Sequence, residues 1–184
     1  IYSEQNKFER SILEYGKGIV LQKTNPKGAA FCYSNRAEQY IRLEQYEKAL
    51  TDYTSAIDLD PENPERYYDR AKFYRAYKEE YNLALIDYSK AIELDSESIT
   101  CLFGRGVLYY SNLNDNKLAL KDFQRILKID PTDIDAINAI GVIYSEQNEF
   151  ERSILEYEKG IALKETNPTG AAFCYRNRAE QYIR

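Results

Sequence analysis

Apolar and small side chains recur along the chain at three- and four-residue spacings, which is the period of an α-helix. Residues 30–60 contain two such runs, and each would form one apolar helix face. Asp60-Pro61 ends the second run, because proline disfavours helical geometry in the residue before it and has no N–H to extend a helix. The pattern predicts a helical hairpin whose packed face carries Tyr33, Ala37, Tyr40, Ala49, Tyr53 and Ala56.

The hairpin pattern returns at regular intervals. Units begin near Ala30, Pro64, Ile99, Ile134 and Ala172, so four successive units are 34, 35, 35 and 38 residues long. The extra residues of the fourth unit, in GIALKETNP, are expected to lengthen its second helix by roughly one turn. The prediction is a single array: a partial repeat at 1–29 that starts with the tail of a first helix, repeats at 30–63, 64–98 and 99–133, a long repeat at 134–171, and the first helix of a further repeat at 172–184.

A longer period also runs through the sequence. Residues 1–42 and 143–184 are identical at 35 of 42 positions, and one difference is Gly16 against Glu158. The four short units add up to this 142-residue spacing, so the long repeat is four short repeats copied together. Because the chain starts with isoleucine and contains no methionine, we expect it to be a slice of a longer protein.

The first complete unit carries small and aromatic residues at eight characteristic places: Tyr33, Ala37, Tyr40, Tyr46, Ala49, Tyr53, Ala56 and Pro61. This arrangement resembles the tetratricopeptide repeat (TPR). The resemblance covers the whole chain, although later units drift, with Gly106 and Gly141 in small-residue places. It implies an all-α fold, a right-handed αα-superhelix (solenoid) of helix-turn-helix hairpins in which each hairpin contacts its neighbours.

Three units also share an arginine in the first helix and an aspartate in the second. We interpret these residues as ion pairs that fix the rotation of the two helices of a hairpin; an anion site is the alternative interpretation. The fourth unit departs from the pattern, with Ile140 and Glu156 in these places. The expected pairs are Arg36 with Asp52, Arg70 with Asp87, and Arg105 with Asp122.

Composition excludes several function classes. The formal net charge of -5 lacks the basic footprint of a protein that binds nucleic acid. The chain has no histidine, which removes the commonest general base and the commonest transition-metal ligand. We therefore expect no enzymatic activity, no cofactor, no metal site and no nucleic-acid partner.

The compartment is inferred from cysteine usage and hydropathy. No apolar run approaches the roughly 20 residues that span a bilayer, so we expect no membrane insertion. Cys32, Cys101 and Cys174 are single, far apart in the array and without the spacing of a zinc site. We expect three buried or half-buried free thiols, which are typical of a reducing compartment such as the cytoplasm.

The resemblance to TPR proteins implies that the first helices line a concave groove for a partner. That face combines aromatic side chains with isolated charges, a composition favoured in protein-binding hot spots, although the aromatic residues could also cover the edge of the core. The candidate groove residues are Phe31, Ser34, Glu38, Tyr68, Lys72, Arg75, Phe103, Val107, Tyr110, Asn138 and Val142.

TPR cochaperones that bind C-terminal carboxylates do so with lysine and asparagine side chains on successive first helices. In this sequence the same places hold Ser34, Glu38, Asp69, Thr100 and Gly104. The resemblance therefore does not extend to that clamp, and we expect no recognition of a chaperone C-terminus.

Two functions follow as hypotheses. The first is a non-catalytic scaffold that binds an extended or helical segment of another protein in its groove. The second is a structural or self-assembling superhelical spacer with no dedicated peptide ligand. The second hypothesis rests on the unpaired helix at each end of the array, because uncapped repeats expose apolar surface and favour end-to-end self-association.

Overall fold

The computed structural model describes residues 2–183, and within them it contains helices and no strands. A short 3₁₀-helix η1 (Val20–Lys23) follows α1, and a π-helix η2 (Tyr74–Lys78) follows α4. The ten α-helices are α1 (Tyr2–Ile19), α2 (Pro26–Arg42), α3 (Tyr46–Leu59), α4 (Pro64–Phe73), α5 (Tyr81–Leu94), α6 (Ile99–Ser111), α7 (Asn116–Ile129), α8 (Ile134–Glu146), α9 (Phe150–Ala162) and α10 (Pro168–Gln181).

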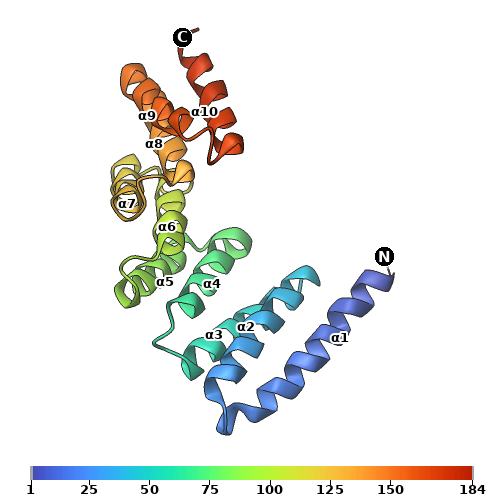
Figure 1. Cartoon of the computed structure of the whole chain (residues 1–184). Helices are drawn as coiled ribbons and strands as arrows, with labels where there is room; N and C mark the ends of the chain where they lie inside the picture. The colour runs from blue at the N-terminus through green and yellow to red at the C-terminus, as the bar shows by residue number, and fades with distance from the viewer. Residues whose placement is uncertain (1, 184) are drawn as a thin grey trace. The chain divides into compact units, whose positions relative to one another are not determined.

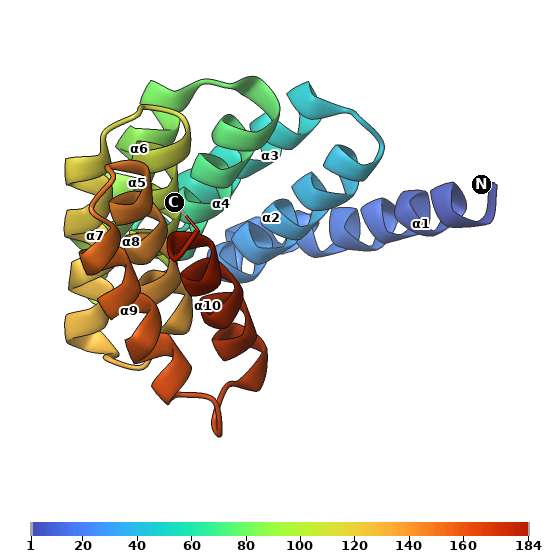
Figure 2. The same ribbon diagram turned by 90° about the horizontal axis from the view of Figure 1, so that it is seen from above.

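The helices form hairpins within two compact units, residues 1–96 and 97–184. In the first unit α2 pairs with α3 and α4 with α5, while α1 packs against α2 (Figure 1). In the second unit α6 pairs with α7 and α8 with α9, and α10 packs against α9 and α8 (Figure 2). The predicted all-α solenoid of helix-turn-helix hairpins is confirmed as the fold class.

Small residues set the distance between the helices of a hairpin. Ala37 is fully buried beside Tyr53 in the core of the first unit. In the second unit a Cβ added to Gly106 would lie 2.8 Å from the ring of Phe123, and one added to Gly141 would lie 2.5 Å from the ring of Tyr157. The aromatic ring of one helix therefore fills the space that the small residue of its partner leaves open, and a larger residue there would overpack the core.

The predicted arginine–aspartate pairs are confirmed in all three hairpins that carry them. Arg36 donates from Nε and Nη2 to the two carboxylate oxygens of Asp52, at 2.7 and 2.8 Å. The same two-bond geometry joins the pairs of the next two hairpins, Arg70 with Asp87 and Arg105 with Asp122.

In the fourth hairpin Ile140 is buried in the arginine place. Glu156 therefore pairs with Lys159 of its own helix, at 2.7 Å.

Asparagine caps and N-terminal prolines start α2, α4 and α10, whereas Ser98 caps α6 and Asp133 caps α8. Asn25 accepts a hydrogen bond from the backbone N–H of Gly28 at 3.0 Å, and Asn167 accepts one from Gly170 at 2.9 Å. Proline is tolerated in the first turn of a helix, where its missing N–H has no intrahelical partner. For this reason α2 and α10 begin at prolines that precede the residues where we place the repeat boundaries.

The extra residues of the long repeat do not lengthen its second helix, so that expectation was wrong. Helix α9 ends at Ala162 and residues 163–167 form a turn instead. The carbonyl of Leu163 accepts hydrogen bonds from the backbone N–H of Asn167 and from the hydroxyl of Thr166. These bonds close the turn, and Asn167 then caps the start of α10.

The two copies of the 42-residue segment differ in structure near their first residues, where only the second copy contains a turn between two helices. In the second copy α8 ends at Glu146, and Asn148 adopts a left-handed conformation with φ of 61° before α9 begins. In the first copy the corresponding residues belong to the continuous helix α1, so the expected separate tail of a first helix is not formed. A turn is favoured only where the helix before it can pack back on the helix after it.

Breaking one arginine–aspartate pair should destabilise the fold. In Asp87→Ala the guanidinium of Arg70 keeps its place without a carboxylate partner, so we expect a loss of about 3 kcal/mol in the free energy of unfolding. Asp58→Ala, on the exposed side of α3, is the matched control and should change it by less than about 0.5 kcal/mol. Urea denaturation followed by circular dichroism measures both, and equal losses would show that the pair does not hold the hairpin.

Candidate groove site in the first unit

The first unit contains a pocket of about 510 Å³ on the predicted groove side of α2 and α4. Its walls come from α2, the following turn, α3, α4 and η2. The lining residues are Glu38, Ile41, Arg42, Glu44, Tyr46, Tyr53, Asp69, Lys72, Phe73, Arg75, Ala76 and Tyr77.

Four aromatic rings in mutual contact make the apolar part of this pocket. Tyr77 stacks on Tyr46 and on Phe73, with ring centroids 5.4 and 5.8 Å apart. Tyr53 meets Phe73 in a tilted arrangement at 5.7 Å. Phe73 is buried, whereas Tyr77 is 45% exposed, so the cluster is anchored in the core and open at one edge. Rigid, partly exposed aromatic clusters are favoured as anchor points for a binding partner.

The π-helix η2 brings Tyr77 to the pocket. The spacing between the small residues of the two helices is one residue longer in this repeat, Ala71 to Ala84, than in the preceding one, Ala37 to Ala49. The extra residue is absorbed in the wider π turn at the end of α4. Such turns recur at functional sites because they redirect side chains within a helix. Sequence reasoning missed Tyr77, and the longer spacing does not single it out, because the same spacing from Gly106 to Ala119 is met without a π turn after α6.

Charges of both signs surround the aromatic cluster, and Asp69 is the most perturbed of them. Burial raises the pKa of Asp69 to about 6, against the attraction of Arg66 and Lys72 and with a further increase from the nearby carboxylate of Glu38. Burial also raises the pKa of Tyr53, and the charges of Asp69 and Glu38 add to this effect. The two carboxylates therefore face the same part of the pocket.

One donor in the pocket is buried and has no hydrogen-bond partner among the residues that the structure describes. It is Nε of Arg75, in η2. A buried donor left without a partner costs free energy, so a ligand carbonyl or carboxylate that reached it would bind favourably.

Arg66 was not anticipated and explains the position of Ser34. Its buried guanidinium donates from Nη1 to the hydroxyl of Ser34 at 3.1 Å and lies 3.9 Å from carboxylate oxygens of Asp60 and Asp69. Ser34 is buried by this contact and does not line the pocket. The signal in the sequence was an arginine where the equivalent places of other repeats hold a small residue such as Cys101.

The remaining predicted residues of the first unit divide into two groups. Glu38, Lys72 and Arg75 all line the pocket. Phe31 is exposed on α2 outside the pocket. Tyr68, also outside it, tilts against buried Tyr88, and its ring lies 5.6 Å from the ammonium of Lys72.

In the second unit the predicted groove residues contact side chains of other helices in that unit. The hydroxyl of Tyr110 donates to Glu146 at 2.6 Å, and burial, together with this bond, raises the pKa of Tyr110. The amide oxygen of Asn138 accepts a hydrogen bond from the thiol of Cys174 at 3.2 Å. Phe103 tilts against the buried ring of Phe123, so it covers the core edge, and Val107 and Val142 are half-buried.

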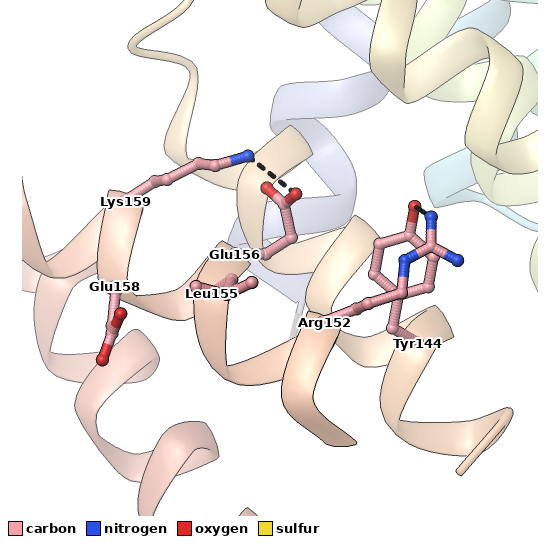
Figure 3. Close-up of a pocket in the computed structure, with 6 residues that line it drawn as sticks. All are labelled: Tyr144, Arg152, Leu155, Glu156, Glu158 and Lys159. Carbon is pink, nitrogen blue, oxygen red and sulfur yellow. Dashed lines mark hydrogen bonds and ion pairs between the residues drawn. The ribbon is translucent and has the colours of Figure 1, made fainter. Parts of the chain in front are cut away.

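A second pocket, also about 510 Å³, lies on α8 and α9 (Figure 3). The guanidinium of Arg152 lies 4.0 Å from the centroid of the Tyr144 ring and donates to its hydroxyl at 2.7 Å. Glu156 pairs with Lys159 as described above. Oε2 of Glu156 is nevertheless buried without a hydrogen-bond partner among the described residues, and the pocket contains one aromatic ring where the pocket of the first unit has four.

Comparison with known proteins identifies the repeat. A family model described as TPR repeat matches residues 37–76, and one described as tetratricopeptide repeat matches residues 100–133 and 134–167. Tetratricopeptide repeat protein 12 from Homo sapiens is 38% identical over 77 residues, and serine/threonine-protein phosphatase 5 from Homo sapiens is 40% identical over 70 residues. These matches cover 42% and 38% of this chain but only 10% and 13% of the relatives' lengths.

Solved structures agree with the fold. MamA has a TM-score of 0.74 at 19% identity, with 90% of this chain and 94% of that chain covered. The first TPR of Spaghetti (RPAP3), bound to the HSP90 peptide SRMEEVD, has a TM-score of 0.60 at 25% identity, with 66% of this chain and 95% of that chain covered. Within residues 2–183, no helix has the length and apolar character needed to cross a membrane.

The carboxyl of Asp69 should titrate near pH 6, about two units above an ordinary aspartate. Because its pKa is raised in the folded state, the folded protein binds this proton more tightly than the unfolded chain does. Lowering the pH from neutrality through 6 should therefore stabilise the native protein relative to Asp69→Asn. A carboxyl-carbon NMR titration measures the midpoint, and a midpoint near 4 would contradict the buried environment.

Proposed function

The chain belongs to the tetratricopeptide repeat family, and from this premise we propose that it is a non-catalytic scaffold whose first-unit pocket binds a segment of a partner protein. The observation that carries the proposal is the pocket itself. It joins an anchored aromatic cluster, open at Tyr77, to charged side chains around the same cavity. Protein-binding hot spots combine these features.

The side chains of the pocket favour a particular ligand chemistry. The aromatic cluster suits an apolar or aromatic side chain, and the unpartnered Nε of Arg75 suits a backbone carbonyl of the bound segment. Glu38 and Asp69 place two carboxylates on the same cavity, where a lysine or arginine of the partner would relieve their mutual repulsion. We therefore propose a partner segment with a basic residue next to an apolar one.

The same carboxylates argue against an acidic ligand of the kind seen in the RPAP3 structure. Glu38, Asp69 and Ser34 occupy places where carboxylate-binding TPR domains carry lysine or asparagine, and Ser34 is buried against Arg66. An acidic peptide end would meet negative charge at the position where such domains provide neutral or positive donors.

The peptide SRMEEVD should bind this chain with a Kd weaker than about 1 mM. SRMKKVD, in which lysines replace both glutamates, should bind more tightly, because its charges complement Glu38 and Asp69. In the double variant Glu38→Asn, Asp69→Asn, the preference for SRMKKVD over SRMEEVD should shrink or reverse. Isothermal titration calorimetry measures the affinities of both peptides for the native chain and for the double variant. Micromolar binding of SRMEEVD to the native chain would contradict the proposed charge preference.

A second candidate function, the spacer or self-assembling array, is favoured by the near identity of the two ends of the sequence. Residues 1–42 and 143–184 share 35 of 42 positions, so the two end segments are built from the same helix faces. This candidate does not use the pocket, and it can coexist with partner binding.

Groove binding is tested by selecting binders from a displayed library of random peptides against the immobilised chain. We expect enriched peptides to combine a basic residue with an aromatic or aliphatic one. Their affinity, measured by fluorescence polarisation, should fall at least about tenfold in Tyr77→Ala, because a partly exposed anchor ring is lost.

Ile86→Ala is the matched control, since Ile86 is 63% exposed on α5 and lies outside the pocket. Its affinity and melting temperature should stay close to native. Failure to enrich any peptide, or equal binding by Tyr77→Ala and the native chain, would overturn the proposal.

A further inference from the structure

One hairpin of the second unit lacks the arginine that the other three hairpins share. In those three hairpins the arginine of the first helix binds both carboxylate oxygens of an aspartate and also lies over the ring of the tyrosine four residues further on. The rings are those of Tyr40, Tyr74 and Tyr109, with 5.7, 5.8 and 5.9 Å between the guanidinium carbon and the ring centroid. A carboxylate and an aromatic face therefore form one binding place for a guanidinium.

The hairpin of α8 and α9 keeps the carboxylate and the ring of this binding place without the arginine. Ile140 stands in the arginine place, whereas Glu156 supplies the carboxylate and Tyr144 supplies the ring. Arg152 of α9 covers the ring instead, with its guanidinium carbon 4.0 Å from the centroid. Its terminal nitrogens donate to the hydroxyl of Tyr144 and to the carboxylate of Glu149. The aromatic half of the binding place is thus filled from inside the hairpin.

The carboxylate half of the binding place is only partly filled. The ammonium of Lys159, on the same helix, donates to Oε1 of Glu156 at 2.7 Å. Oε2 of Glu156 is buried and has no hydrogen-bond partner among the residues that the structure describes. In the other hairpins both oxygens of the corresponding carboxylate accept hydrogen bonds from the arginine. A buried acceptor without a partner costs free energy, so a donor that reached Oε2 would bind favourably.

The pocket on α8 and α9 offers a ligand access to this carboxylate. Glu156 lines the pocket, and Figure 3 shows its carboxylate next to Lys159 and apart from the stacked side chains of Arg152 and Tyr144. Leu155 is 58% exposed, and the side chain of Lys159 is 59% exposed. Both can therefore move aside for an incoming group.

The same face of a second helix is open elsewhere in the array. Helix α3 packs against α2 and α4, yet Lys48 and Thr51, its counterparts of Arg152 and Leu155, are exposed. The pocket therefore lies on a face that the adjacent hairpins of a unit leave uncovered.

We propose that this pocket binds the guanidinium of an arginine side chain from a partner protein, with Oε2 of Glu156 as its acceptor. Both cations of the pocket, Arg152 and Lys159, already have partners, so the group left to a ligand is an anion and the ligand is a cation. Exposed Leu155 lies beside Glu156 and suits an apolar neighbour of that arginine. This site is independent of the pocket in the first unit.

A guanidinium fits the site better than the other common cations. The three complete hairpins place a guanidinium against the corresponding carboxylate, and its planar fork carries several donors in fixed positions. Within residues 2–183, no group of three or more potential metal-ligating side chains could hold a metal ion. A lysine of the partner would reach the same oxygen only as a point charge.

An NMR titration of the whole chain with the capped tripeptide acetyl-Leu-Arg-Leu-amide tests the site. We expect the methyl signals of Leu155 and the carboxyl-carbon signal of Glu156 to shift and to saturate at millimolar peptide. The matched peptide carries citrulline, which has the shape of arginine without its charge, and its affinity should be at least about tenfold weaker. Because the signals belong to α9, the result does not depend on the pocket of the first unit.

Two variants locate the acceptor. Glu156→Gln keeps the size of the side chain but removes its charge, so the affinity measured at the Leu155 methyl groups should fall at least about tenfold. Glu151→Gln is the matched control, because it makes the same charge change at an exposed place of α9 outside the pocket, and it should bind as the native chain does. Ile140→Arg restores the arginine of the other hairpins and should abolish binding by occupying Glu156.

Ile140 is buried, so circular dichroism must show that Ile140→Arg keeps the native fold; otherwise Glu156→Gln alone decides. Equal affinities of the arginine and citrulline peptides, or of the native chain and Glu156→Gln, would overturn the proposal. Ethylguanidinium carries the same cation without a peptide and should bind more weakly than the tripeptide, because it does not contact Leu155. Equal affinity would assign the pocket to a free guanidinium compound and overturn the assignment to a partner protein.

Discussion

Within each unit, a helix buries its apolar face against the helices one or two places away in the chain. This packing between near neighbours is the constraint on which the rest of the structure depends. Small residues such as Ala37 and Gly141 let the neighbouring helix come close enough for an aromatic ring to fill the gap. The arginine–aspartate pairs then fix the rotation of the two helices.

The pocket of the first unit follows from the same construction. Its aromatic rings belong to the core between α3 and α4, so the cluster is held by folding rather than by a ligand. The π turn then adds Tyr77 to the open edge of that cluster. Arg36 and Asp52 form an ion pair inside the hairpin and stabilise the fold. The charged side chains of Glu38 and Lys72 line the pocket instead.

The sequence is informative wherever the repeat period determines the outcome. The hairpins, the arginine–aspartate pairs and the free cysteines follow from spacing alone and are confirmed, because each depends on the immediate neighbour in the array. Features that depart from the period could not be predicted in this way. Arg66 stands in a place where other repeats have a small side chain, and its contact with Ser34 crosses from one hairpin to the next.

The two copies of one segment show most clearly where local sequence stops deciding structure. The residues Ser-Glu-Gln-Asn lie in a continuous helix in the first copy and span the end of α8 and the following turn in the second. Because these four residues are identical, the difference comes from their surroundings, which include α8 before the second copy and Glu149 in place of Lys7 after it. The sequence of these four residues therefore cannot by itself predict which of the two conformations they adopt.

A neighbouring helix, and not the segment's own sequence, determines how firmly each helix is held. Amide hydrogen exchange followed by NMR in the dilute monomer tests it, comparing residues 11–18 of α1 with residues 153–160 of α9. We expect at least about tenfold weaker protection in α1, because α9 packs against α8 and α10 whereas α1 packs mainly against α2 and the adjoining η1. Equal protection in both copies would contradict it.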